Sequence, residues 1–233
     1  YLTGRFISLI GTGIQQVALP LFILDLTHSG MLMGVFSALN LVPNLIASPF
    51  AGILGDRKNR RNIMVSVDFG RGILVCFLGL LAFHGKLSIS ILFISQIAIS
   101  IMDSLFNSSS SAIIGELLEE DELMRAMSVR GGLDAFSYII GPALGGVIYG
   151  FIGIKAVFLI NGASFFISGI TAIFMIYKCK NHKHQKMTVT LFLKENVDVL
   201  KYIKSNIGLM QLFTFAMISN LLVEPLLDII FPY

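Results

Sequence analysis

The stretch Gly52-Ile53-Leu54-Gly55-Asp56-Arg57-Lys58-Asn59-Arg60-Arg61 decides the fold of this chain. It holds four basic residues and one acidic residue, and it joins the apolar runs Met31–Leu54 and Ile63–Phe83. A segment this short and this charged does not enter a bilayer, so it must lie at a membrane surface with a helix on either side. We therefore expect a helical hairpin whose turn faces the cytoplasm.

The composition of the chain is that of a polytopic membrane protein. Hydrophobic residues make up 55% of the 233 residues, charged residues make up 13%, and the mean hydropathy is +0.82. A soluble core of this size could not bury so much apolar surface. The net charge of +3 comes from residues in loops between apolar runs rather than on one face. It therefore indicates membrane topology and no nucleic-acid partner.

Seven apolar runs are long enough to cross the hydrocarbon core as helices, which takes about 20 residues. They are Leu2–Leu26, Met31–Leu54, Ile63–Phe83, Leu87–Ile114, Gly131–Ile152, Ala156–Tyr177 and Ile207–Ile230. The acidic stretch Glu116–Glu122 is expected to form a soluble segment before the fifth run. Because the runs are continuous and show no alternation of period two, the predicted fold class is all-α.

The positions of lysine and arginine predict the orientation of these helices, since basic residues accumulate on the cytoplasmic side. With the N-terminus inside, Lys86 and Lys155 are outside, Arg71 lies within the membrane and the other fourteen are cytoplasmic. The fourteen are Arg5, Arg57, Lys58, Arg60, Arg61, Arg125, Arg130, Lys178, Lys180, Lys183, Lys186, Lys194, Lys201 and Lys204. We expect a multi-pass protein with a cytoplasmic N-terminus.

Three parts follow from this topology. Residues 1–177 form a six-helix bundle, residues 178–205 form a basic cytoplasmic linker with an amphipathic helix, and residues 206–233 form one further span. Six spans, a basic linker and a further span are the plan of a transporter built from two six-helix halves. We expect the chain to hold one half and the first helix of the next, with sequence missing at both ends.

Four charged residues deep in the predicted spans are candidates for proton transfer: Asp68, Arg71, Asp103 and Asp134. A charge in hydrocarbon is costly and persists when it is paired or faces a water-filled cavity. Asp68 and Arg71 share a helical face, and Asp103 is expected at the depth of Arg71 on the next helix. Two hypotheses stay open: the cluster locks helices together, or one carboxylate exchanges a proton during transport.

Uncharged polar residues near the middle of the first two spans are candidates for lining a cavity. They are Gln15 and Gln16 in the first span, and Asn40 and Asn44 in the second. Substrates of two-half transporters bind near the midplane. Ordinary hydrogen bonding between helices is the alternative.

The fifth span contains a series of small residues. The series is Ser137, Gly141, Pro142, Gly145 and Gly146. Small side chains allow helix backbones to approach closely, and Pro142 removes a backbone donor and favours a kink. We expect this helix to be tightly packed and bent.

The sequence carries no hydrolytic triad, Walker loop or zinc motif. His182 and His184 lie in a lysine-rich run, where solvated side chains are commoner than a metal site. We expect neither an enzyme nor a protein that holds a metal or an organic cofactor.

The stretch Gly52–Arg61 resembles the signature Gly-x-Leu-x-Asp-Arg-x-Gly-Arg-Arg of the major facilitator superfamily, with Asn59 where glycine is commoner. Residues Ser137–Gly146 resemble the fifth-helix signature of its drug and proton antiporters. A wider pattern resembles the branch of bacterial macrolide-efflux and enterobactin-exporter proteins. That pattern consists of Ala18-Leu19-Pro20-Leu21, Asp68-x-x-Arg71 and Glu122-Leu123-x-Arg125-Ala126-Met127.

The resemblance implies a six-helix half of a major facilitator fold, a 3+3 inverted repeat, in a bacterial cytoplasmic membrane. It implies that Gly52 allows close helix approach and that Asp56 contacts a helix of the opposite half. It also implies that Arg57, Arg60 and Arg61 bind acidic groups or lipid phosphates. The fourth-helix arginine often linked to proton coupling is absent, since residues Leu87–Ile114 contain no basic side chain. Asp103 or Asp68 then becomes the candidate proton carrier.

The expected function is export of an amphipathic drug, such as a macrolide, driven by the proton gradient and carried out by alternating access. Its partners are then a small-molecule substrate, the lipid bilayer and the missing C-terminal half. Export of a siderophore or a lysolipid is an alternative within the class. A membrane scaffold or sensor that transports nothing is an alternative outside it.

Overall fold

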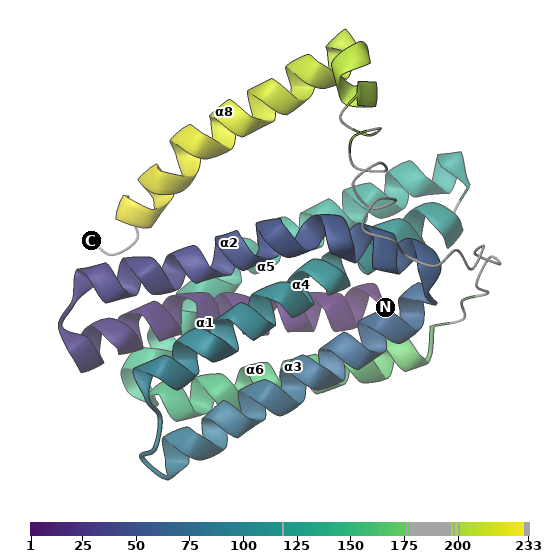
Figure 1. The fold of residues 1–233 in the computed structure, drawn as a ribbon. Coiled ribbons are helices and arrows are strands. Elements are labelled where there is room, and N and C mark those ends of the chain that lie inside the picture. Colours follow the sequence, from purple (N-terminus) through teal and green to yellow (C-terminus); the bar gives the residue numbers. More distant parts are fainter. Residues whose placement is uncertain (118, 176, 178–196, 198, 200, 231–233) are drawn as a thin grey trace. The chain divides into compact units, whose positions relative to one another are not determined.

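The computed structural model describes residues 1–117, 119–175, 177, 197, 199 and 201–230. The chain divides into two units, Tyr1–Lys183 and His184–Tyr233. Every regular element among the described residues is an α-helix, which confirms the predicted fold class (Figure 1).

Six helices form the first unit. They are α1 (Leu2–Thr27), α2 (Gly30–Arg57), α3 (Arg60–Phe83), α4 (Ile89–Leu117), α5 (Glu120–Phe151) and α6 (Ile154–Ile173). Each contains a segment long and apolar enough to cross a membrane. In the second unit, α8 (Ile207–Ile230) coincides with the seventh predicted run. Its described apolar part, Ile207–Ser219, is shorter than the six segments, so its crossing of the membrane stays a prediction.

Short turns join α1 to α2, α2 to α3 and α5 to α6, and capping side chains begin α2 and α3. His28 ends α1 in the left-handed conformation (φ 51°), and the Ser29 hydroxyl accepts a hydrogen bond of 3.4 Å from the first turn of α2. Asn59 caps α3 in the same way at 3.2 Å. Between α5 and α6, Gly153 has a φ of 92°, which few residues other than glycine adopt.

Two predicted boundaries differ from the observed helix ends. The acidic stretch Glu116–Glu122 lies between two candidate membrane spans, but it is helical at both ends, because α4 continues to Leu117 and α5 begins at Glu120. Glutamate, leucine, methionine, alanine and arginine all favour helix, and the water outside a bilayer does not end one. The sixth helix ends at Ile173 rather than at Tyr177.

The packing of the six helices shows a repeat. The pairs with extensive contact are α3 with α6, α1 with α5, α2 with α4, α1 with α6, and α3 with α4. Exchanging α1, α2 and α3 for α4, α5 and α6 turns α1 with α5 into α4 with α2, turns α1 with α6 into α4 with α3, and leaves α3 with α6 unchanged. This is the arrangement expected of a 3+3 repeat. Figure 1 shows α3 and α6 lying side by side.

Two apolar clusters meet along α3. Residues 63–67 of α3 supply one cluster, together with Phe106 and Ile113 of α4. Residues 75–82 supply the other, together with side chains of α1 and α6. The segment of α3 between them carries the buried charges Asp68 and Arg71.

Candidate functional site

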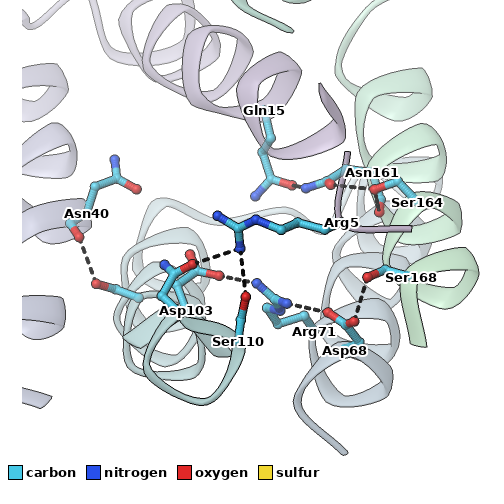
Figure 2. A network of polar contacts seen from close by, with 12 residues as sticks. Arg5, Gln15, Asn40, Asp68, Arg71, Asp103, Ser110, Asn161, Ser164 and Ser168 are labelled. Carbon is cyan, nitrogen blue, oxygen red and sulfur yellow. Dashed lines mark hydrogen bonds and ion pairs between the residues drawn. The ribbon is translucent and has the colours of Figure 1, made fainter. Parts of the chain in front are cut away.

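Asp68, Arg71 and Asp103 meet inside the bundle as one cluster. The Arg71 guanidinium donates one hydrogen bond to Asp103 of α4 and another to Asp68, one turn away on α3. The Ser168 hydroxyl of α6 donates to the second oxygen of Asp68 at 2.7 Å. The cluster thus joins α3, α4 and α6, as Figure 2 shows.

Two aromatic rings enclose the charge of Arg71. Its guanidinium carbon lies 4.5 Å from the ring centre of Phe106 and 4.4 Å from that of Phe165, within the range of cation–π attraction. The side chains of Asp68 and Arg71 are 0% and 4% exposed, whereas that of Asp103 is 22% exposed. Asp103 is therefore the least buried member of the cluster.

The formal charge of this cluster is negative. One guanidinium faces two carboxylates, so the sum is −1 when both are ionised. An uncompensated charge in a low dielectric is costly, and taking up one cation removes it. The cluster thus has the composition of a site that binds one proton or one cationic group. Its binding function and the helix-locking alternative both remain predictions.

Sequence reasoning did not find the partner of Asp134. Its two oxygens accept hydrogen bonds from Nε and Nη2 of Arg5 at 3.2 and 3.0 Å, across 129 positions of the chain. The other Arg5 nitrogen, Nη1, contacts Asn107 at 3.3 Å and Ser110 at 3.4 Å on α4. The one signal in the sequence is the position of Arg5 within the apolar run Leu2–Leu26.

Gln15 is buried in contact with α6, whereas its neighbour Gln16 is exposed. The amide of Asn161 donates to Gln15 at 2.5 Å, and the Ser164 hydroxyl donates to Asn161 (Figure 2). Gln15 therefore joins α1 to α6, and Gln16 is the better candidate for lining a cavity.

Asn40 joins α2 to α4. Gln96 donates to its side-chain oxygen, and the Ser100 hydroxyl donates to its backbone carbonyl at 2.8 Å. Asn44, one turn further along α2, is half-buried. The first of these two candidates is thus used in helix packing, while a role of Asn44 in a cavity stays a prediction.

The small residues of α5 divide between two faces. A Cβ atom on Gly141 would lie 2.9 Å from the Cα of Gly13, and one on Gly145 would lie 2.6 Å from the backbone oxygen of Ile14. Ser137, one turn before Gly141, is buried. Gly146 lies on an exposed face, where a Cβ atom would meet no described residue within 4 Å. The helix continues through Pro142, so the expected kink stays a prediction.

The basic residues of the opening stretch have different partners. Arg60 donates to the carbonyl of Gly55 at 3.1 Å and forms an ion pair of 3.5 Å with Glu116. Arg61 donates to the last carbonyls of α6, among them that of Ala172 at 3.2 Å, and so caps the negative end of that helix. The ion pair of Arg60 is thus with an acidic residue, whereas the contacts of Arg61 are with backbone carbonyls.

The remaining members of the stretch have fewer described contacts. A Cβ built on Gly52 would have no described atom within 4 Å beyond its own turn of helix. Gly55, in contrast, is buried near two serines of α4. Asp56 and Arg57 belong to α2, but their side chains lie outside the described part of the structure. Within that part, no three His, Cys, Asp or Glu side chains form a group that could hold a metal.

Comparison with known proteins gives the following matches. The family model described as Major Facilitator Superfamily matches residues 1–232. Macrolide efflux protein A of Streptococcus pyogenes is 24% identical over 229 residues, which cover 98% of this chain and 56% of that protein. Multidrug resistance protein 2 of Bacillus subtilis (strain 168) is 29% identical over 75% of this chain and 42% of its own length.

A further match is the Staphyloferrin A transporter of Staphylococcus aureus (strain NCTC 8325 / PS 47). It is 22% identical over 76% of this chain and 45% of its own length. The chain spans about half the length of the curated relatives it matches.

Proposed function

Because this chain belongs to the Major Facilitator Superfamily, we propose that it is the N-terminal half, with the first helix of a second half, of a proton-coupled exporter. The exporter lies in a bacterial cytoplasmic membrane with its N-terminus in the cytoplasm, and it works by alternating access. Six membrane-length helices and the greater length of the relatives support this proposal.

The cluster of Asp68, Arg71 and Asp103 carries the proposal. Its one excess negative charge is satisfied either by a proton or by a cationic group of the substrate, and not by both at once. Asp103 is the partly exposed member and therefore the proton carrier we propose. Competition for one carboxylate gives exchange, since the substrate leaves when a proton replaces it.

The substrate class we propose is an amphipathic compound with a basic amine, such as a macrolide. Relatives named for macrolide efflux and for multidrug resistance support this class. An apolar body suits the helix bundle, and a protonated amine suits the negative cluster.

The test measures proton movement in vesicles that contain the full-length protein, with a pH-sensitive dye, after a macrolide is added. We expect substrate-dependent proton release from the wild type and at least about a tenfold loss in Asp103→Asn, which corresponds to roughly 1.4 kcal/mol. Asp25→Asn is the matched control, because Asp25 is an exposed carboxylate near the C-terminal end of α1 and lies outside the cluster. Its side chain accepts a hydrogen bond from Tyr149. Unchanged proton release in Asp103→Asn would refute the assignment.

Export of a siderophore is the second candidate, supported by the Staphyloferrin A transporter among the relatives. Growth of deletion strains under iron limitation and under macrolide challenge separates the two. A defect confined to iron limitation would favour the siderophore.

We also propose that Asp56 contacts a helix of the second half, that Arg57 binds acidic groups or lipid phosphates at the cytoplasmic surface, and that Gly52 allows a helix of the second half to approach α2 closely. The exposed surroundings of Gly52 in this half support a partner outside it.

A further inference from the structure

Arg5, Arg130 and Asp134 form a second charged cluster, between α1, α4 and α5. Asp134 pairs with Arg5 at 3.0 Å and with Arg130 at 3.7 Å. The side chains of the two arginines are only 7% and 11% exposed. Two guanidinium groups thus share one carboxylate, and the formal charge of this cluster is +1.

Hydrogen-bond donors in this cluster outnumber its acceptors. Arg5 uses Nε and Nη2 on Asp134, which leaves Nη1 with two long contacts of 3.3 and 3.4 Å to Asn107 and Ser110. Arg130 donates through Nη2 to Ser111 at 3.0 Å. Its Nη1 is buried and has no partner among the residues that the structure describes. A buried donor without an acceptor is costly, so a missing acceptor is indicated.

Both arginines also donate to the same segment of α4, and Nη1 of Arg130 is the donor left without a partner among the described residues. Arg5 contacts Asn107 and Ser110, and Arg130 contacts Ser111, the next residue. Of these α4 residues, Asn107 and Ser111 are exposed, so the segment is accessible from outside the bundle. Two guanidinium groups and neighbouring hydroxyl and amide donors are the chemistry that binds carboxylate and phosphate oxygens.

We propose that this cluster is an anion-binding site, in which Arg5 and Arg130 hold one carboxylate or phosphate group beside residues 107–111 of α4. The group comes either from a soluble anion or from the headgroup of an anionic lipid. The site does not depend on the proposed proton exchange, because it shares no charged residue with the cluster of Asp68, Arg71 and Asp103.

The experiment measures the thermal unfolding of the full-length protein in nanodiscs as inorganic phosphate is added, with chloride at equal ionic strength as the salt control. In phosphatidylcholine nanodiscs we expect a saturable rise of the unfolding midpoint with phosphate. Arg130→Gln should weaken the apparent affinity by about tenfold or more, the usual effect of losing a charged hydrogen bond. Arg125→Gln is the matched control, since Arg125 lies on the same helix and is exposed.

A second set of nanodiscs, with phosphatidylglycerol added, identifies the source of the anion. If the lipid headgroup occupies the site, phosphate adds no further stabilisation there, and Arg130→Gln removes the difference between the two lipid mixtures. Arg5→Gln applies the same test to the other arginine. If Arg5→Gln does not fold, Arg130→Gln alone decides the test.

The proposal is wrong if phosphate has no effect beyond that of chloride in phosphatidylcholine, or if Arg130→Gln and Arg125→Gln respond alike. Loss of proton exchange in Asp103→Asn with intact phosphate binding would support both proposals. Phosphate binding without any substrate-dependent proton release would retain the anion site and refute the exporter.

Discussion

Arg71 is the residue on which the buried charges of α3 and α4 depend. It is the one described cation in contact with Asp68 and Asp103, and its side chain is 4% exposed. Phe106 and Phe165 pack against its guanidinium and keep water away. The stability of the six-helix unit should therefore respond strongly to its charge.

Arg71→Met should destabilise the protein by about 3–5 kcal/mol, because it leaves two carboxylates without a cation in a low dielectric. Unfolding in detergent, followed by circular dichroism, measures the change. Adding Asp68→Asn and Asp103→Asn to Arg71→Met should recover most of the loss, since no unpaired charge then remains. A loss below about 1 kcal/mol in the single variant would contradict the assignment.

The extent to which sequence predicts such residues differs between the two clusters. Spacing along one helix predicted the pair of Asp68 and Arg71, and counting residues from the membrane surface placed Asp103 at the same depth. The contact of Arg5 with Asp134 could not be predicted in this way. Sequence gives the depth of a residue in the bilayer, but it does not say which helices are neighbours.

At the scale of elements, the contact of α1 with α5 rests on glycine. Gly141 lies against Gly13, and Gly145 lies against Ile14, with room for no side chain on either α5 residue. Close backbone approach of this kind is a source of helix association in membranes, where lipid is as apolar as leucine. The interface should therefore be sensitive to a single methyl group.

Gly145→Ala should destabilise the six-helix unit by about 1–3 kcal/mol, because the added Cβ would lie 2.6 Å from a backbone oxygen of Ile14. Gly146→Ala is the matched control at the next residue, where a Cβ meets no described atom within 4 Å. We expect the control to be neutral or slightly stabilising, since alanine favours helix over glycine. Thermal unfolding of the two variants in the same detergent compares them, and equal midpoints would contradict the described packing.

The sequence predicted that α5 contains a stripe of small residues but not which of them form the interface. Ser137, Gly141 and Gly145 are four apart and share a face, whereas Gly146 lies about 100° further round the helix. The face that packs is decided by the position of α1. Likewise, the apolar pattern located the six helices well, but the start of α5 lies outside the apolar run and leaves no hydrophobic signal.

At the scale of the whole molecule, the exchange of α1, α2 and α3 with α4, α5 and α6 maps the set of major helix contacts in the first unit onto itself. A helix that crosses a membrane has its two ends at opposite surfaces. Lys58 lies between α2 and α3 and Lys86 between α3 and α4, and both are exposed. They are therefore suited to test the orientation.

In a background with Cys76→Ser and Cys179→Ser, Lys58→Cys should react with a membrane-impermeant maleimide only when the cytoplasmic surface is accessible. Lys86→Cys should react in intact cells, because the loop after α3 is outside. The expectation rests on the excess of basic residues on the cytoplasmic side. The reverse pattern would overturn the orientation, and labelling of both from one side would overturn the crossing of α3.

The ring of Phe106 lies close to arginines of both charged clusters, which bears on the cost of placing those charges in a bilayer. Its ring lies 4.5 Å from the guanidinium carbon of Arg71 and 5.9 Å from that of Arg5. It thus lies near one arginine of each charged cluster, and the formal sums of the two clusters, −1 and +1, together are neutral. Moving a net charge from water into lipid costs several kcal/mol. When all six side chains are ionised and neither cluster has bound an ion, the helix bundle therefore holds two groups of opposite charge with no net charge.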